Sequence, residues 1–231
     1  MTQKLKLIEI YSSIQGESTA AGRPCVLIRL SGCPMRCSYC DSSFAFEGGE
    51  EISIPSLMVR IAAFGIPLVE LTGGEPLAQP STPALVKELC DQGYEVLIET
   101  GGGVSIEGLD PRARIILDVK TPASGMQGRQ KWDNLKLLRA HDEIKFVICS
   151  REDYEWSRDH VLQQKLSDHY VVLFSPMEPE AVDETIEKTE MLEKIGVTKQ
   201  ELAEWILEDR LKVRLNLQLH LWIWGRGVRR V

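Results

Sequence analysis

The sequence lacks the features that mark membrane proteins and nucleic-acid-binding proteins. It contains no run of about 18 apolar residues, which a membrane-spanning helix needs. Basic residues number 27 against 34 acidic ones, and the net charge of -7 argues against general attraction to nucleic acid backbones. Residues 1–13 lack the apolar core of a secretory signal peptide. These absences predict a cytoplasmic protein that binds neither membranes nor nucleic acid.

The cysteines are unevenly distributed along the chain. In a reducing compartment the six cysteines are better explained as ligands or buried thiols than as disulfide partners. Three of them stand alone in apolar stretches and are expected to lie in the core: Cys25, Cys90 and Cys149. The other three crowd into one short segment, SGCPMRCSYCDSS at 31–43, which is therefore the first candidate for a functional site.

What the sequence does contain is an alternation of short apolar runs and helix-like segments. Alternating strands and helices predict a parallel sheet with right-handed crossovers. The runs read as apolar throughout, as expected for parallel strands covered on both faces. The predicted strands are 24–32, 68–73, 95–102, 114–120, 143–150 and 170–176, and the helix-like segments are 55–65, 81–92, 131–141 and 151–166.

Six strands are too few for a closed eight-stranded barrel, so we predict an α/β fold, a partial, open TIM-like barrel of about six parallel strands. The link between the strands at 95–102 and 114–120 is too short and glycine-rich for a full crossover helix, so some helices should be reduced. Residues 179–212 predict one or two charged amphipathic helices, and 213–225 can add a final strand. The chain, 1–231, is expected to form one domain with a C-terminal extension from about residue 179.

The three crowded thiols, Cys33, Cys37 and Cys40, follow the spacing Cys-x3-Cys-x2-Cys. Structural zinc sites are almost always closed by four ligands, whereas a trio leaves one coordination position open. Sulfur ligands favour zinc, copper(I) or iron–sulfur clusters. Zinc stays open as an alternative with the adjacent Asp41 as a fourth ligand, because the histidines are distant in sequence. An iron–sulfur cubane held by three cysteines would keep one iron free to bind a small molecule.

Unusual residue clusters lie at the same end of successive predicted strands. The cysteine segment follows the first strand, and TGGEP, ETGG, DVK and SPMEP end or follow the second, third, fourth and sixth. In open and barrel-like α/β folds, ligands bind at the carboxyl ends of the strands. The sequence therefore predicts one site built from the cysteine segment and these turns.

The cysteine segment also carries a family resemblance. CPMRCSYC resembles the cluster motif of radical S-adenosylmethionine enzymes, and TGGEP at 72–76 resembles their glycine-rich stretch. Motifs spread over nearly the whole chain resemble, more narrowly, the 7-carboxy-7-deazaguanine synthase family. These motifs are IYSSIQGE (10–17), VLIRLSGC (26–33), CDSSF (40–44), LTGGEP (71–76), SPMEP (175–179) and LQLHLWIWG (217–225).

The resemblance implies an activity and a set of cofactors. Members of this family convert 6-carboxy-5,6,7,8-tetrahydropterin to 7-carboxy-7-deazaguanine with loss of ammonia, in the biosynthesis of queuosine and other 7-deazapurines. A [4Fe–4S] cluster reduces S-adenosylmethionine to a 5′-deoxyadenosyl radical, which takes hydrogen from C6 of the substrate. The resemblance further implies Mg²⁺, a homodimer, and an external one-electron reductant such as flavodoxin.

Roles for individual residues follow from the resemblance. Cys33, Cys37 and Cys40, in the loop 31–44, would hold the cluster. The S-adenosylmethionine site would comprise Tyr39, Cys40, Asp41, Gly74, Glu75, Asp118, Val119, Lys120, Ser175, Pro176, Met177 and Glu178. Three members of this set depart from the family pattern: Asp118 and Val119, because DVK stands where Ser-Pro-Lys is usual, and Ser175, which stands where glutamine is usual.

The substrate site would comprise Ile14, Gln15, Gly16, Glu17, Arg29 and Thr72. Arg29 lies in an otherwise apolar strand with no acidic neighbour, where an unpaired guanidinium is costly. A substrate carboxylate that binds through two hydrogen bonds would pair with it. Ser42 stands where the family usually has a threonine that binds Mg²⁺, and it keeps the hydroxyl group.

Two other functions compete with this interpretation. A radical enzyme that activates a glycyl radical partner shares the cluster spacing, but the SSIQGE and LQLH segments are not expected there. A zinc-binding interaction module is the non-enzymatic alternative. Iron and acid-labile sulfide, measured against zinc, distinguish the two classes.

Overall fold

The protein is built on one open sheet of nine strands. A computed structural model describes residues 3–178, 196–225, 228 and 230. Neighbouring strands follow the order β3-β1-β2-β4-β5-β6-β7-β8-β9, so β3 and β9 form the two edges. The strands are β1 (Lys4–Ile14), β2 (Pro24–Leu30), β3 (Glu50–Ser53), β4 (Leu68–Gly73), β5 (Glu95–Thr100), β6 (Arg114–Val119), β7 (Glu143–Ile148), β8 (Val171–Pro176) and β9 (Arg214–Leu215).

All six predicted strands are present as β2 and β4 to β8, and they pair in parallel. The unclosed, mostly parallel sheet confirms the open barrel. The prediction missed β1 and β3, which add an antiparallel edge beside β2. In β1, Leu5, Leu7 and Glu9 are buried and alternate with more exposed residues, the pattern of an antiparallel strand with one face covered.

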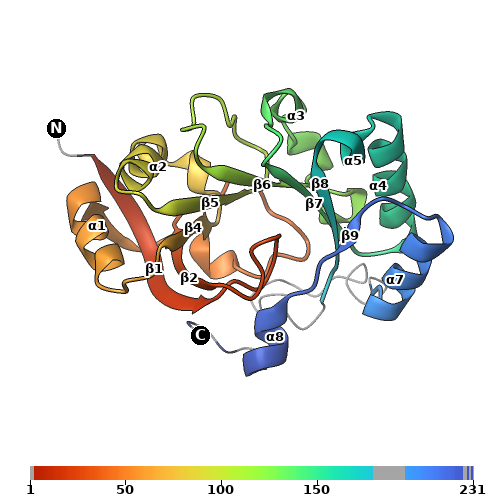
Figure 1. The fold of residues 1–231 in the computed structure, drawn as a ribbon, viewed down its shortest axis with the longest axis horizontal. Coiled ribbons are helices and arrows are strands. Elements are labelled where there is room, and N and C mark those ends of the chain that lie inside the picture. The colour runs from red at the N-terminus through yellow and green to blue at the C-terminus, as the bar shows by residue number, and fades with distance from the viewer. Residues whose placement is uncertain (1–2, 179–195, 226–227, 229, 231) are drawn as a thin grey trace.

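Helices lie along the outside of the sheet, with α1 and α2 beside one half and α4, α5 and α7 beside the other (Figure 1). Their apolar faces, including Leu57, Ile61, Leu85 and Leu89, form the main core with the strands. The helices are α1 (Ile54–Ala62), α2 (Thr82–Asp91), α3 (Asn134–Leu137), α4 (Arg151–Gln163), α5 (Leu166–His169), α7 (Lys199–Glu208) and α8 (Leu219–Trp224).

Two of the predicted helices have a short or a divided counterpart. The segment 131–141 contains only α3, which begins at Asn134 and ends where Leu138 turns to an extended conformation. The Asn134 side chain donates to the carbonyl oxygens of Gly102 and Val104 in the link 101–113. The segment 151–166 divides into α4 and α5. The link at 101–113 contains no helix, as predicted, and part of the predicted charged helical region, 179–195, lies outside the described residues.

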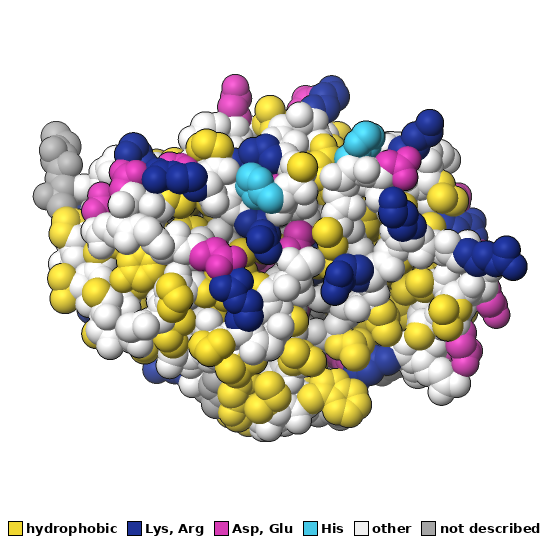
Figure 2. All heavy atoms as spheres, in the orientation of Figure 1, with side chains coloured by type: hydrophobic (Ala, Val, Ile, Leu, Met, Phe, Trp, Pro, Cys, Tyr) yellow, Lys and Arg dark blue, Asp and Glu magenta, His cyan; other side chains and the backbone are white. Residues whose placement is uncertain are grey.

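The final strand predicted at 213–225 is mostly wrong. Only Arg214 and Leu215 pair with β8, and the chain then turns into α8. Trp222 and Ile223 on α8 are 66% and 52% exposed, and apolar side chains gather at this lower edge of the molecule (Figure 2). None of the helices within the described residues is long and apolar enough to cross a membrane.

The strands are not apolar throughout, which corrects a second prediction. Single charged residues interrupt the apolar pattern: Arg29 in β2, Glu70 in β4, Glu99 in β5, Asp118 in β6 and Lys145 in β7. All five line one cavity inside the curved sheet. The outer face packs against helices, so only the inner face can carry charge.

Candidate active site

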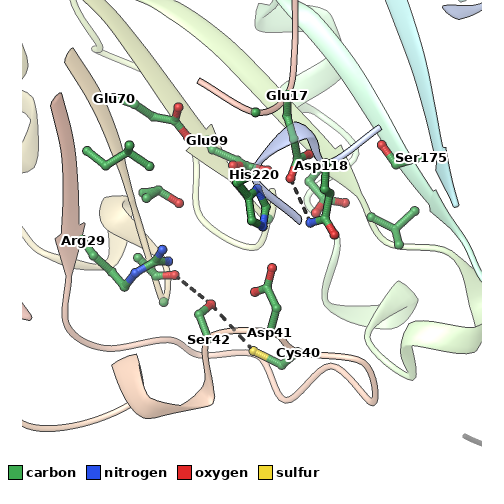
Figure 3. Close-up of a pocket in the computed structure, with 18 of the residues that line it drawn as sticks. Glu17, Arg29, Cys40, Asp41, Ser42, Glu70, Glu99, Asp118, Ser175 and His220 are labelled. Carbon is green, nitrogen blue, oxygen red and sulfur yellow. Dashed lines mark hydrogen bonds between the residues drawn. The ribbon is translucent and has the colours of Figure 1, made fainter. Parts of the chain in front are cut away.

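A cavity of about 640 Å³ opens inside the sheet and reaches the carboxyl ends of the strands. It gathers residues from β1, β2 and β4 to β8, and Figure 3 shows side chains from several of these strands pointing into it. Every predicted site residue lines this cavity except Val119, whose side chain is 1% exposed within the apolar core. The sequence motifs therefore converge on one place.

The cysteine loop packs tightly against the glycine-rich turn that follows β4. The amide of Glu75 donates to the carbonyl oxygen of Gly32 at 2.7 Å. A Cβ atom at Gly74 would lie 2.4 Å from that same oxygen and 2.9 Å from the Cβ of Cys33, so only glycine fits. Arg36 braces the loop by donating to the carbonyl oxygens of Cys33 and Met35.

The Glu75 carboxylate holds the ends of two strands together. It accepts hydrogen bonds from the Thr100 hydroxyl and from the amides of Gly101 and Leu77, at 2.8 to 3.0 Å. Burial raises its pKa, although these donors favour the ionised form. The side chain is thus largely occupied within the protein, which fixes the shape of the turn beside the cysteine loop.

The loop after β1 carries Glu17 into the opposite part of the cavity. Its carboxylate lies 3.0 Å from the Lys145 ammonium and accepts a hydrogen bond from Gln218 at 3.0 Å. Burial raises the Glu17 pKa, but Lys145 and Gln218 more than offset this effect and leave it lowered. The Gln15 side chain accepts from the amide of Glu17, which stiffens the loop.

Asp118 and Lys120 face the cavity from the end of β6, and Val119 between them points into the core. The Lys120 ammonium lies 2.7 Å from Asp118 and 6.0 Å from the centre of the Tyr39 ring. Tyr39 packs with Met177, Ala123 and Cys149 in a small apolar cluster at this wall. An apolar wall beside a buried ion pair suits a ligand that has both a flat ring and charged groups.

The segment after β8 completes this wall. The Ser175 hydroxyl accepts a hydrogen bond from the Asn216 side chain at 2.8 Å, and Glu178 pairs with Lys199 at 2.9 Å. Pro176 and Met177 lie between them and line the cavity. Ser175, which departs from the family pattern, therefore contacts the C-terminal segment.

The chain is similar to known proteins in sequence and in fold. A sequence model of the Radical SAM superfamily matches residues 27–150. The 7-carboxy-7-deazaguanine synthase of Koribacter versatilis (strain Ellin345) is 42% identical over 228 residues, covering 95% of this chain and 97% of that protein. The enzyme of the same name from Chlorobaculum tepidum is 38% identical over 234 residues, covering 98% and 97%. The chain belongs to the 7-carboxy-7-deazaguanine synthase family.

The fold agrees with this assignment to a family of radical S-adenosylmethionine enzymes. The crystal structure of QueE from Escherichia coli superposes with a TM-score of 0.71, covering 93% of this chain and 94% of that one at 20% identity. Membership in the radical SAM superfamily implies a [4Fe–4S] cluster and S-adenosylmethionine as cofactors. It also removes the zinc-binding interaction module as an explanation of the cysteines.

The residues of this synthase-family chain fit those cofactors. Tyr39 Oη and Asp118 Oδ1 are buried at the cavity without a hydrogen-bond partner among the described residues, as expected where a polar ligand binds. Burial raises the pKa of all three thiols, to about 11 for Cys40, so an adjacent iron is needed to favour the thiolates. Over the described part of the chain, no three His, Cys, Asp or Glu side chains converge on one metal ion, whereas a cluster spreads its ligands over several irons.

Arg29 differs from the expectation in one respect. It has an acidic partner, because the Glu9 carboxylate of the neighbouring strand β1 lies 2.9 Å from its Nε. The acidic partner comes from another strand and not from β2 itself, so the alternative that Arg29 pairs with a distant acidic residue is met in this respect. This partner could not be identified beforehand, since β1 was missing from the predicted fold. The side chain still lines the cavity, and in β2 it stands opposite Thr72 of β4.

Ser42 lines the cavity next to Asp41, which is exposed. Its hydroxyl donates to the carbonyl oxygen of Gly73 at 3.3 Å and lies 4.0 Å from the Cys40 sulfur (Figure 3). The side chain is 8% exposed. This arrangement places the hydroxyl between the cysteine loop and the glycine-rich turn.

Several cavity residues were not anticipated from the sequence. The set comprises Glu9, Tyr11, Glu70, Glu99, Lys145, Gln218 and His220. Charged residues inside apolar strands were the available signal for Glu70, Glu99 and Lys145, because each breaks a run that is otherwise apolar. Gln218 and His220 lay in a segment expected to be a strand, so their approach to the cavity could not be anticipated.

Proposed function

We propose that this enzyme converts 6-carboxy-5,6,7,8-tetrahydropterin to 7-carboxy-7-deazaguanine with release of ammonia, as a step in queuosine or other 7-deazapurine biosynthesis. The observation that carries the proposal is that one cavity joins the three thiols to the Gln15–Glu17 loop, Arg29 and Thr72. Relatives at 42% and 38% identity over nearly the full chain carry the name of this activity.

Cys33, Cys37 and Cys40 would hold the [4Fe–4S] cluster in this proposal. When bound, the cluster would supply the electron for reductive cleavage of S-adenosylmethionine, the radical chemistry that a reaction at C6 of the substrate needs. The wall at Tyr39, Lys120 and Met177 orients the S-adenosylmethionine, and Gly74 allows its close approach to the loop. The protein supplies orientation and excludes side reactions.

Glu17 and Arg29 would orient the substrate. The ionised Glu17 carboxylate accepts hydrogen bonds from the guanidine-like edge of a pterin, with Gln15 and Thr72 nearby. Arg29 binds the substrate carboxylate through its terminal nitrogens, while Glu9 holds the Nε. Binding both ends of the substrate fixes C6 relative to the cysteine loop.

Mg²⁺ would bind the substrate carboxylate beside Ser42. Mg²⁺ prefers oxygen ligands in octahedral geometry and keeps several waters, so one protein hydroxyl with a substrate carboxylate is a reasonable ligand set. If Ser42 is a ligand, Ser42→Ala should raise the Mg²⁺ concentration needed for half-maximal rate, and Ser42→Thr should preserve it. An unchanged Mg²⁺ dependence in the alanine variant would refute this role.

The remaining parts of the proposal are a cytoplasmic location, an external one-electron reductant such as flavodoxin, and a homodimer. The family resemblance supports the reductant and the homodimer. Size-exclusion chromatography with light scattering tests the dimer, and turnover with reduced flavodoxin against dithionite tests the donor.

Anaerobic incubation of the reconstituted enzyme tests the reaction itself. With 6-carboxytetrahydropterin, S-adenosylmethionine, Mg²⁺ and a reductant, mass analysis should find 7-carboxy-7-deazaguanine and ammonia in equal amounts. Absence of product from an enzyme with full iron and sulfide content would overturn the proposal. Hydrogen abstraction from a polypeptide instead would favour the glycyl radical activase.

A further inference from the structure

Glu70 is a cavity residue to which neither the motifs nor the proposed reaction assigns a role. It lies in β4, two residues before Thr72, and its side chain lines the cavity. The residue is 4% exposed, and its Oε2 atom receives no hydrogen bond among the described residues. A buried carboxylate oxygen without a donor is costly, so this atom needs an explanation.

The side chain that faces Glu70 is another carboxyl group. Glu99, from the adjacent strand β5, lies within hydrogen-bonding reach of Glu70, and Figure 3 shows the two side chains next to each other. Two ionised carboxylates have no proton to share and repel each other. One proton shared by Glu70 and Glu99 removes the repulsion and allows a hydrogen bond between the two carboxyl groups.

The surroundings decide which of the two carboxyl groups carries the proton. Glu99 contacts the Lys145 ammonium, which also pairs with Glu17 at 3.0 Å. Burial raises the Glu99 pKa too, but Lys145 opposes this effect and favours the ionised form of Glu99. Glu70 has no comparable ion pair among the described residues. Burial, followed by the charges of Glu99 and Glu17, raises the Glu70 pKa well above its usual value. The titratable groups that influence Glu70 from the surrounding elements are Tyr11, Cys25, Glu17, Glu99 and Lys145.

We propose that Glu70 is a positioning residue: as a neutral carboxylic acid, it donates a hydrogen bond to the Glu99 carboxylate and aims that carboxylate into the cavity. Lys145 holds Glu99 from the other side. Glu99 then presents its remaining lone pairs to an N–H group of the bound ring system. The cluster of Glu17, Glu70, Glu99 and Lys145 carries a net charge of about -1 in this state, because two carboxylates face one ammonium.

This inference rests on the proposed function, and its test uses substitutions that separate charge from hydrogen bonding. Glu70→Gln keeps the shape and donates an N–H to Glu99, whereas Glu70→Leu keeps the approximate size and donates nothing. We expect Glu70→Gln to retain kcat/KM within about threefold and Glu70→Leu to lose about 10- to 100-fold, as for one hydrogen bond to a charged group. Glu95→Gln, which alters an exposed carboxylate paired with Arg23, is the matched control and should change nothing.

The pH profile and a double substitution report positioning rather than packing. If wild-type activity falls at alkaline pH because Glu70 ionises, that limb should be absent or displaced in Glu70→Gln. In a Glu99→Gln background, Glu70→Leu should cost little more, because Glu70 acts through Glu99. Iron content, melting temperature and S-adenosylmethionine cleavage without substrate establish that each variant is folded and loaded.

The outcomes are separable. If the wild-type enzyme makes no 7-carboxy-7-deazaguanine, the proposed function fails. If it does, and Glu70→Gln is as impaired as Glu70→Leu, Glu70 works as a charge and the positioning role is overturned. Normal kinetics in Glu70→Leu, or an equal loss in the Glu99→Gln background, would overturn it as well.

Discussion

The three cysteines of the loop at 31–44 differ from the buried Cys90 in their surroundings. Cys33, Cys37 and Cys40 line the cavity, whereas Cys90 packs in the main core on α2. Replacing any one of the three by alanine should abolish activity and most of the bound iron. Cys90→Ala should keep both, at a modest loss of stability from the smaller side chain. Iron and sulfide analysis, together with measurements of turnover, checks this prediction. Full activity in a variant of one of the three loop cysteines would refute the cluster assignment.

Arg29 must serve two carboxylates at once if the substrate binds as proposed. Its Nε is bonded to Glu9, and a lysine has a single ammonium that cannot reproduce this fork. Arg29→Lys should therefore lower turnover of 6-carboxytetrahydropterin by about 10- to 100-fold, at about 1.4 kcal/mol per factor of ten. Cluster content and S-adenosylmethionine cleavage without substrate should stay near normal. Normal kinetics would exclude the carboxylate contact, and loss of folding would assign Arg29 to the support of β1 and β2.

At the scale of elements, the parallel strands could be predicted from the sequence, whereas β1 and β3 at one edge of the sheet could not. Aliphatic runs bounded by glycine and proline predicted the six parallel strands. The first strand, β1, alternates polar and apolar residues, and only its pairing with β2 shows that Glu9 meets Arg29. The helix α8 is short and its Trp222 and Ile223 are exposed, so its sequence resembles a strand as much as a helix.

For the site, too, one part could be predicted from the sequence and another could not. Motifs at strand ends converge because parallel strands direct their carboxyl ends to one edge, and this rule requires no knowledge of side-chain contacts. The partners within the site depend on register and on long-range approach. Lys145 meets Glu17 across more than a hundred positions in sequence, and no local pattern encodes that contact.

The approach of α8 to the Gln15–Glu17 loop gives a prediction at this scale. A Cβ atom at Gly16 would lie 2.9 Å from the His220 Nδ1 and 3.3 Å from its amide nitrogen, and the Gly16 carbonyl accepts from Leu219. Gly16→Ala should push α8 away and raise the KM for the pterin about tenfold, since overpacking typically costs about 1–3 kcal/mol. Steady-state kinetics measures the effect.

Gly128→Ala is the matched control for that substitution. Gly128 has no atom near its missing Cβ and no left-handed backbone, so activity should be unchanged. An unchanged KM in Gly16→Ala would show that α8 can move without affecting the substrate. It would also show that His220 has no part in substrate binding.

For the whole molecule, the buried charges inside the sheet oppose stability. Glu17, Glu70, Glu99 and Asp118 line the cavity together with Lys145 and Lys120. Burial penalises the charged forms of Glu17, Glu70 and Glu99. A protein selected for stability alone would place apolar side chains there. In the proposed function, these polar groups bind and orient a polar, hydrogen-bonding ligand.

Glu70 makes this conflict measurable as a dependence of stability on pH. Its pKa is raised in the folded state, so the fold binds the proton more tightly than the unfolded chain does. The stability linked to this proton is complete below the ordinary carboxyl pKa and is lost as pH rises towards the folded-state value. Glu70→Gln removes the titration, so its stability relative to wild type should grow with pH, by up to about 1.4 kcal/mol per pH unit. Melting temperatures of anaerobically reconstituted enzymes at pH 5.5 and pH 8 check this expectation.

Glu95→Gln is the control and should show no such gain, because Arg23 lowers the Glu95 pKa. If the stability difference between Glu70→Gln and wild type is independent of pH, Glu70 is ionised in the folded protein.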